Sequence, residues 1–288
     1  MFSDDTEHSI IVAQCLIESF DDEKLFEKLL KKRMQLWLLA LPAGVGFATM
    51  RGIFKSFFMK NSGVFSAGNA PAMRSSLIGL MFGKDDKMLK KFIKINTNIT
   101  HSDPKAYYGA LAVAKATYLS ATNNREIFFE TMQNLVNDEE FLALLRNIET
   151  NLHLSTMDFA SKLGLEKGVS GYIYHTLPIA LHSWLKNGDD VRQAIIDVIK
   201  CGGDTDTTGA IVGGIVGAGS KNFPKEWSDN IIDYPRNLNF LKKLSHKLDE
   251  TIEAQSPLTA PRLSGVAIII RNILFIFLVF VVGITRLF

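Results

Sequence analysis

The stretch Cys201-Gly202-Gly203-Asp204-Thr205-Asp206-Thr207-Thr208-Gly209 places two carboxylates and several hydroxyl groups where a glycine turn leads into a helix. The apolar pattern that follows predicts that this helix continues to Ala218. Glycines recur four residues apart at 209, 213 and 217. Because residues four apart share one side of a helix, we expect a nearly bare backbone face there that neighbouring elements pack closely.

The aspartates of this stretch indicate a cation site. Carboxylates gathered at a buried helix start repel one another unless positive charge lies between them. The helix N-terminus supplies part of that charge, and a divalent cation would supply the rest. Oxygen ligands favour Mg²⁺, Mn²⁺ or Ca²⁺ over Zn²⁺. An EF-hand is excluded because Ile215 stands where the loop needs Glu. On this stretch alone, a simple N-cap at Asp204 or Asp206 is an equal alternative.

A second cluster of acids and hydroxyls, Ser3-Asp4-Asp5-Thr6-Glu7, comes directly before another apolar helical run. Asp4 and Glu7 have the spacing of a capping box, so an ordinary cap is the alternative interpretation. Together with Asp204 and Asp206, the cluster offers a second set of oxygen ligands, and the two sets could hold one or two cations. Paired cations can polarise a substrate oxygen and activate a water.

Two segments rich in glycine and small residues, Pro42–Gly52 and Ser66–Arg74, each carry an arginine near their end. Their backbone amides could cradle a phosphate, with Asn69 and the arginines as further donors, although ordinary turns look similar. His101 could orient a ligand or be a structural histidine. Tyr172 could stack on a base or ribose, or belong to the core.

The composition indicates no strong attraction to nucleic acid, and the sequence pattern predicts an all-α chain. The chain has 288 residues, 47% of them hydrophobic, with 32 basic and 30 acidic side chains in near balance. Its two cysteines, Cys15 and Cys201, make neither a disulfide framework nor a zinc site, which suits a reducing compartment. Strand signals are almost absent, and the loop Gly164–Ser170 could lie over a pocket.

The C-terminal end reads as a separate segment. We expect a main domain at 1–254, a linker at 255–264 and an apolar tail at 265–288. A membrane span needs about twenty apolar residues, so the tail would need Arg271 to reach back to the interface. Because the tail shows almost no polar face, we predict a single-pass transmembrane anchor on the cytoplasmic face of a membrane, with a buried terminal helix as the alternative.

Several of these segments, in this order along the chain, resemble the ADP-ribosylglycohydrolase family, in particular its bacterial members similar to dinitrogenase reductase-activating glycohydrolase. The resemblance covers roughly residues 3 to 245. It rests on Ser3-Asp4-Asp5-Thr6, Pro42 to Gly52, Gly68-Asn69 through Met73-Arg74, Thr100-His101, Gly171 to Pro178 and Gly203-Asp204-Thr205-Asp206-Thr207.

The resemblance implies a compact all-helical fold with a binuclear centre of two Mg²⁺ ions, Mn²⁺ being possible. The implied reaction is hydrolysis of the glycosidic bond between ADP-ribose and an acceptor, commonly an arginine side chain. The expected partner is an ADP-ribosylated protein or a small ADP-ribose compound, with no nucleic acid, and the chain is expected to be monomeric. The expected metal ligands are Ser3, Asp4, Asp5, Asp204, Asp206 and Thr207, of which Asp4, Asp5 and Asp206 are also catalytic, and the expected substrate-binding residues are Gly68, Asn69, His101 and Tyr172.

Three departures from the family pattern leave a second interpretation open. The family normally begins with a glycine-rich helix ahead of the Ser3 segment, and this helix is missing here. The segment Gly44-Val45-Gly46 lacks the acid that arginine-specific members can carry nearby, and Ala70-Pro71 stands where a further glycine is common. The alternative function is therefore a catalytically weakened module that binds ADP-ribose or ADP-ribosylated proteins.

Overall fold

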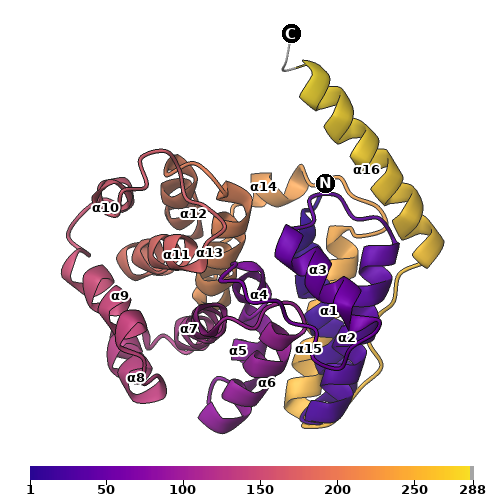
Figure 1. Cartoon of the computed structure of the whole chain (residues 1–288), viewed down its shortest axis with the longest axis horizontal. Helices are drawn as coiled ribbons and strands as arrows, with labels where there is room; N and C mark the ends of the chain where they lie inside the picture. The colour runs from indigo at the N-terminus through magenta and orange to yellow at the C-terminus, as the bar shows by residue number, and fades with distance from the viewer. Residues whose placement is uncertain (286–288) are drawn as a thin grey trace.

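The computed structural model describes residues 1–285, the side chains of 282–285 excepted, and within this range it forms sixteen α-helices, one 3-10 turn and no β-strand (Figure 1). The prediction of an all-α fold is confirmed. The elements are α1 Asp4–Ser19, α2 Glu23–Leu39, α3 Phe47–Ser56, α4 Ala70–Met73, α5 Ser76–Phe82, α6 Asp86–Asn98, α7 Pro104–Ala121, η1 Arg125–Ile127, α8 Phe128–Leu135, α9 Glu139–Thr150, α10 Thr156–Lys162, α11 Ile173–Asn187, α12 Val191–Lys200, α13 Thr205–Gly219, α14 Lys225–Asp229, α15 Leu238–Ala254 and α16 Gly265–Thr285.

Helix α7 lies at the centre of the molecule, against α4, α5, α6, α11 and α13 (Figure 1). Five of its six alanines are buried, all but Ala121, so the surrounding helices approach its backbone closely. At Gly79 of α5, an added Cβ would lie 2.0 Å from the carbonyl oxygen of Ala114. The small residues of α7 thus let one helix serve as the common core contact for five others.

Neighbouring elements approach helix α13 most closely at glycines outside the set that the four-residue spacing indicated. A Cβ at Gly209 or Gly217 would meet nothing within 4 Å, so the predicted closely packed glycine face is wrong there. Close approaches occur instead at Gly214, where a Cβ would lie 2.6 Å from Ser76 Oγ, and at Gly219, where it would lie 2.4 Å from the Ser120 carbonyl oxygen. Spacing alone did not show which side of α13 faces its neighbours.

The turn that begins α13 is braced by the loop 164–170. The Val169 amide donates to Gly202 O (3.0 Å), and the Asp204 amide donates to Val169 O (2.7 Å). Gly203 has φ +79°, a left-handed conformation that glycine adopts at least cost. The loop therefore fixes the backbone of the acid-rich turn and does not lie over a pocket as expected.

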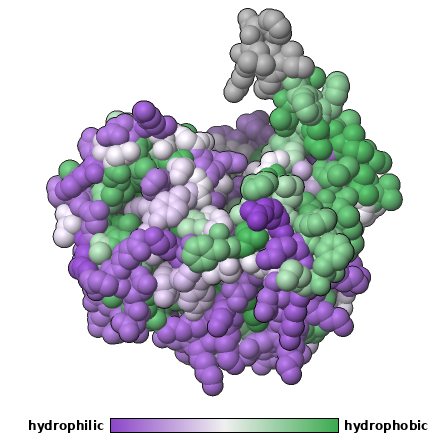
Figure 2. All heavy atoms as spheres, in the orientation of Figure 1, coloured by the Kyte–Doolittle hydropathy of each residue, from purple (hydrophilic) through white to green (hydrophobic). Residues whose placement is uncertain are grey.

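Helix α16 carries an exposed apolar face that includes Ile270, Ile273 and Phe277, visible as the green region over this helix in Figure 2. Its start is nevertheless held against the domain by polar contacts. Arg271 is buried and bonded to Glu7 and Asp233, and buried Asn272 donates to Ala40 O (2.8 Å).

In the part of the chain that the structure describes, no helix combines the length and the apolar character that a membrane crossing requires. The predictions of a transmembrane tail at 265–288, of membrane association and of a location on the cytoplasmic face of a membrane are therefore wrong. The physical reason is that Arg271 does not reach toward an interface, because it is committed to buried ion pairs with the domain. Residues 286–288 of the predicted tail lie outside the described residues.

Candidate active site

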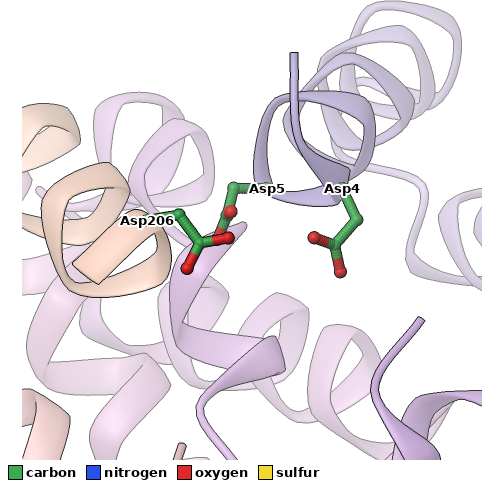
Figure 3. A group of neighbouring side chains, drawn as sticks. All are labelled: Asp4, Asp5 and Asp206. Carbon is green, nitrogen blue, oxygen red and sulfur yellow. The ribbon is translucent and has the colours of Figure 1, made fainter. Parts of the chain in front are cut away.

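The two acid clusters, almost two hundred residues apart in the sequence, meet at one point. Asp4 and Asp5 lie at the start of α1, and Asp206 lies in the first turn of α13. Each offers a carboxylate oxygen, and the three oxygens lie within 4.8 Å of one another (Figure 3). The first turns of α1 and α13 thus face each other across a small space that carboxylates line.

These acids are not helix caps. Seven of the described helices begin with a side chain that accepts a hydrogen bond from a first-turn amide, as Asp190 does for α12. The N-cap residues of α1 and α13, Ser3 and Asp204, make no such bond. The capping interpretations of both clusters therefore fail, and the free acid oxygens are available for another partner.

The charges at this point are poorly compensated by the protein. Burial, together with the neighbouring carboxyls of Asp5 and Asp206, raises the pKa of Asp4 to about 7. Burial also raises the pKa of Asp5, against the effect of the Ser3 hydroxyl, which donates to Asp5 Oδ2 (2.7 Å). Asp5 Oδ1 is buried without a hydrogen-bond partner among the described residues. A buried, unpaired carboxylate oxygen beside two further carboxyls suits a divalent cation.

Asp204 is not one of the three clustered acids, and its carboxylate is bound by Asn69. Its Oδ2 accepts a hydrogen bond from Asn69 Nδ2 (2.7 Å), and the same amide group donates to Thr176 Oγ1 (3.1 Å). Burial raises the pKa of Asp204, while the bond from Asn69 opposes the rise. Asn69 thereby links the loop before α4 to the acid turn of α13. The role of Asp204, Thr207 and Ser3 as metal ligands stays a prediction.

A cavity of about 300 Å³ opens beside the carboxylates. It is formed by the loop before α3 with the first turn of that helix, by the segment around α4, and by the starts of α1 and α13. The predicted substrate-binding residues Gly68, Asn69 and His101 all contribute to its wall. Its lining residues are Asp4, Gly44, Gly46, Phe47, Ala48, Thr49, Gly68, Asn69, Ala70, Met73, His101, Gly171, Asp204, Asp206 and Thr207.

His101 is held as a neutral ring at the wall of this cavity. Arg74 Nη2 donates to Thr100 Oγ1 (2.7 Å), and the same hydroxyl lies 2.9 Å from His101 Nδ1. Because a hydroxyl group can both donate and accept, this contact fits either tautomer of the ring. Burial and the nearby Arg74 guanidinium lower the pKa of His101 to about 3, which keeps the ring neutral. Gly68 is required here because a Cβ would lie 2.7 Å from His101 Nε2.

Two residues that the sequence suggested for substrate binding, Arg74 and Tyr172, do not line the cavity. Arg74 was expected as an anion donor, but it is buried and bonded to Asn96 and Thr100, and it does not line the cavity. The Tyr172 side chain does not line the cavity either, and its hydroxyl accepts from Lys105 Nζ (3.2 Å). Substrate binding by Tyr172 stays a prediction. The Arg74 network has no local sequence signal because its partners lie far from it in the sequence: Asn96 in α6, Thr100 in the turn after α6 and His8 in α1.

Comparisons with known proteins agree with this geometry. Residues 1–257 match the family model described as ADP-ribosylglycohydrolase. The chain is 27% identical to ADP-ribosylhydrolase ARH3 of Gallus gallus over 80% of this chain and 73% of that protein. It is 25% identical to ADP-ribosyl-[dinitrogen reductase] glycohydrolase of Rhodospirillum rubrum over 88% of this chain and 76% of that protein.

A solved structure titled "ADP-ribosylglycohydrolase-related protein complex" has a similar fold. The TM-score is 0.61 at 20% sequence identity, over 94% of this chain and 82% of that one. The matched range of the family model contains all three clustered acids and every residue that lines the cavity. The protein is thus a hydrolase of ADP-ribose glycosidic bonds, and it belongs to the ADP-ribosylglycohydrolase family.

Proposed function

We propose that this ADP-ribosyl hydrolase depends on two divalent cations, Mg²⁺ or Mn²⁺, and releases ADP-ribose from a modified protein side chain. The observation that carries the metal dependence is Asp5 Oδ1, buried and unpaired among the described residues, within a cluster of three carboxylates at the cavity wall. The donors are oxygens only, which suits these two metals.

Asp4, Asp5 and Asp206 would hold the cations, with Ser3, Asp204 and Thr207 as the further ligands proposed. When bound, divalent cations supply Lewis-acid polarisation of substrate oxygens and a more acidic water. With the ribose bound beside them, the carboxylates would help to stabilise the positive charge that develops on it as its glycosidic bond breaks.

The remaining cavity residues would orient ADP-ribose. With its proton on Nε2, the neutral His101 ring would donate a hydrogen bond to a substrate oxygen while Nδ1 accepts from the Thr100 hydroxyl. The amides at the start of α3, next to Gly46, offer a site for the anionic diphosphate, because a helix N-terminus favours negative charge. Asn69 would keep Asp204 in place through its Nδ2, whose two hydrogens go to Asp204 and Thr176, and would present its Oδ1 as an acceptor to the ribose side of the cavity.

For the acceptor we propose an arginine side chain, and serine is the competing possibility. A relative from Serratia proteamaculans, 34% identical over 84 residues, is named an ADP-ribosylarginine hydrolase, whereas the relative from Gallus gallus is named only as an ADP-ribosylhydrolase. The test uses two peptides of the same sequence, one ADP-ribosylated on arginine and one on serine, incubated with the purified chain and Mg²⁺.

Release of free ADP-ribose is followed by mass spectrometry, and an excess of EDTA is then added. We expect release from the arginine peptide that stops in EDTA and resumes when Mg²⁺ is restored. Release from the serine peptide alone would overturn the acceptor assignment. Release that continues in EDTA would overturn the metal dependence. Binding of either peptide without release would favour the weakened binding module.

Cation binding is expected to weaken as the pH falls below about 7. Because the pKa of Asp4 is raised to about 7, a cation must displace its proton at lower pH, and the apparent affinity should fall by up to about tenfold per pH unit. Without metal, the folded state keeps this proton while the unfolded chain loses it near pH 3.8, so stability should fall as pH rises from about 4 to 7.

Isothermal titration calorimetry with Mn²⁺ at pH 6, 7 and 8, and thermal unfolding with and without metal, measure both effects. In the control variant Asp4→Asn the carboxyl no longer titrates, so this contribution to the pH dependence of binding should disappear. Equal Mn²⁺ affinities at pH 6 and pH 8 in the unaltered protein would contradict the prediction.

A further inference from the structure

The start of α1 is held by a buried cluster of four charged side chains that do not line the cavity, Glu7, Asp233, Arg236 and Arg271. Two are acidic and two are basic, so the cluster is electrically balanced. The side chains of Arg271, Glu7 and Asp233 are 3%, 3% and 0% exposed. This cluster belongs to none of the contacts used above for the cavity or the carboxylates.

Arg271 and Asp233 together bind the peptide groups on both sides of Phe2, the residue directly before Ser3. Its Nη2 donates to Phe2 O (2.7 Å) and to Asp233 Oδ2 (2.6 Å). The Phe2 amide donates to the same Asp233 oxygen (2.8 Å). The guanidinium and the carboxylate thus fix the backbone that leads into the first turn of α1.

The same guanidinium also holds the far end of that turn. Its Nη1 donates to Glu7 Oε1 (2.7 Å), which accepts a second bond from Arg236 Nη1 (2.6 Å), while Trp37 Nε1 donates to Glu7 Oε2 (2.5 Å). Between Phe2 and Glu7 lie Asp4 and Asp5. One planar, multidentate side chain therefore spans the whole turn that presents two of the three clustered carboxylates.

The first turn of α1 needs tertiary contacts because the local hydrogen bonds that usually fix a helix start are missing or long. Ser3 makes no capping bond, and the first helical bond, from the Glu7 amide to Ser3 O, is long at 3.3 Å. Repulsion among Asp4, Asp5 and Asp206 acts to open the same turn. A helix start with unsatisfied amides and mutually repelling acids frays unless tertiary contacts fix it.

We propose that Arg271, which lies in α16 beyond the matched range 1–257, is a positioning residue for the carboxylate site. It fixes the turn of α1 so that Asp4 and Asp5 face Asp206 before any cation arrives. The effect on cation binding rests on the proposed function above, whereas the effect on the order of the turn does not.

The test compares Arg271→Met with Asn272→Ala in the full chain. Asn272 is the matched control because it is also buried at the start of α16 and its amide donates to Ala40 O after α2. Its Oδ1 accepts one bond from Arg271 Nη1 (3.1 Å), but the bonds of Arg271 to Phe2, Glu7 and Asp233 do not depend on it. Loss of groups that orient metal ligands typically costs ten- to a hundredfold in affinity. We expect about tenfold weaker Mn²⁺ binding in Arg271→Met and less than about twofold change in Asn272→Ala.

Hydrogen exchange of the Glu7 amide in metal-free protein supplies the second readout. Exchange should be faster in Arg271→Met and unchanged in Asn272→Ala. Arg271→Lys, which keeps the charge but not the bidentate geometry, should restore only part of the Mn²⁺ affinity and of the protection. If Arg271→Met does not fold, Arg271→Lys and Asp233→Asn carry the same two measurements.

Unaltered exchange at Glu7 together with unaltered Mn²⁺ affinity would overturn the positioning role. Equal effects of Arg271→Met and Asn272→Ala would overturn it as well, since general docking of α16 would then explain both. Absence of Mn²⁺ binding in the unaltered protein would instead count against the proposed metal dependence, and the exchange measurement would still decide the role of Arg271.

Discussion

Replacing Asp206 by alanine is expected to lower the rate of ADP-ribose release by on the order of a thousandfold, which corresponds to about 4 kcal/mol of transition-state stabilisation. The variant loses one of the three oxygens that lie within 4.8 Å of one another, and with it a proposed cation ligand. Mn²⁺ should no longer raise the thermal unfolding temperature. Rate measurements at saturating substrate and unfolding curves with and without Mn²⁺ test both results.

The metal-free Asp206→Ala protein should be at least as stable as the unaltered one. Asp206 raises the pKa of both Asp4 and Asp5 by repulsion, so its removal relieves unfavourable charge in the fold. The control is Asp190→Ala, which removes a cap that accepts from the Gln193 amide (2.9 Å) far from the cavity. That control should cost about 1 kcal/mol of stability and leave turnover unchanged. Intact turnover in Asp206→Ala would refute the site.

The second large effect is expected for Gly203→Ala. An added Cβ would lie 2.1 Å from the carbonyl oxygen and 2.4 Å from the amide nitrogen of Val169, and the residue would keep a φ of +79° that alanine disfavours. Backbone atoms cannot yield as a flexible side chain can. We expect the free energy of unfolding to fall by about 3 kcal/mol or more.

Turnover should fall in the same variant because the displaced turn carries Asp204 and leads into Asp206. Gly217→Ala is the control within the same helix, since a Cβ there meets nothing within 4 Å. It should leave turnover unchanged and stabilise α13 by up to about 1 kcal/mol. Urea unfolding measures both variants. Equal stabilities of Gly203→Ala and Gly217→Ala would show that the brace between Val169 and Gly203 is not needed.

The acid clusters and most long helices could be predicted from the sequence because their signals are local. Asp22 and Asn237 begin α2 and α15 as capping residues, and apolar residues recur at helical spacing behind them. Helix α11 has a weaker local signal, because Pro178 lies inside it and a proline disfavours a continuous helix. The surrounding core overrides that local penalty, since Pro178 and its neighbours are buried.

Side-chain contacts between residues far apart in the sequence could not be predicted. Glu7 was interpreted as half of a capping box, but its carboxylate accepts from Trp37, Arg236 and Arg271. Arg271 was assigned to a membrane interface because an arginine in an apolar helix has no visible partner in the sequence. Only the folded chain shows that its counter-charges come from Glu7 and from Asp233. A charged residue that looks unpaired in an apolar stretch of sequence can therefore form buried ion pairs in the folded protein.

The ion pair between Glu7 and Arg271 joins residues 264 positions apart. A ribosome therefore makes this carboxylate 264 residues before its partner Arg271. Until α16 has been made, α1 carries a carboxylate without the counter-charge of Arg271. Domains built from local contacts can mature as they emerge, but this contact forms late. With Arg271 in the proposed positioning role, the carboxylate centre is completed only after α16 has been translated, and a chain that stops before α16 carries its acids without their final arrangement.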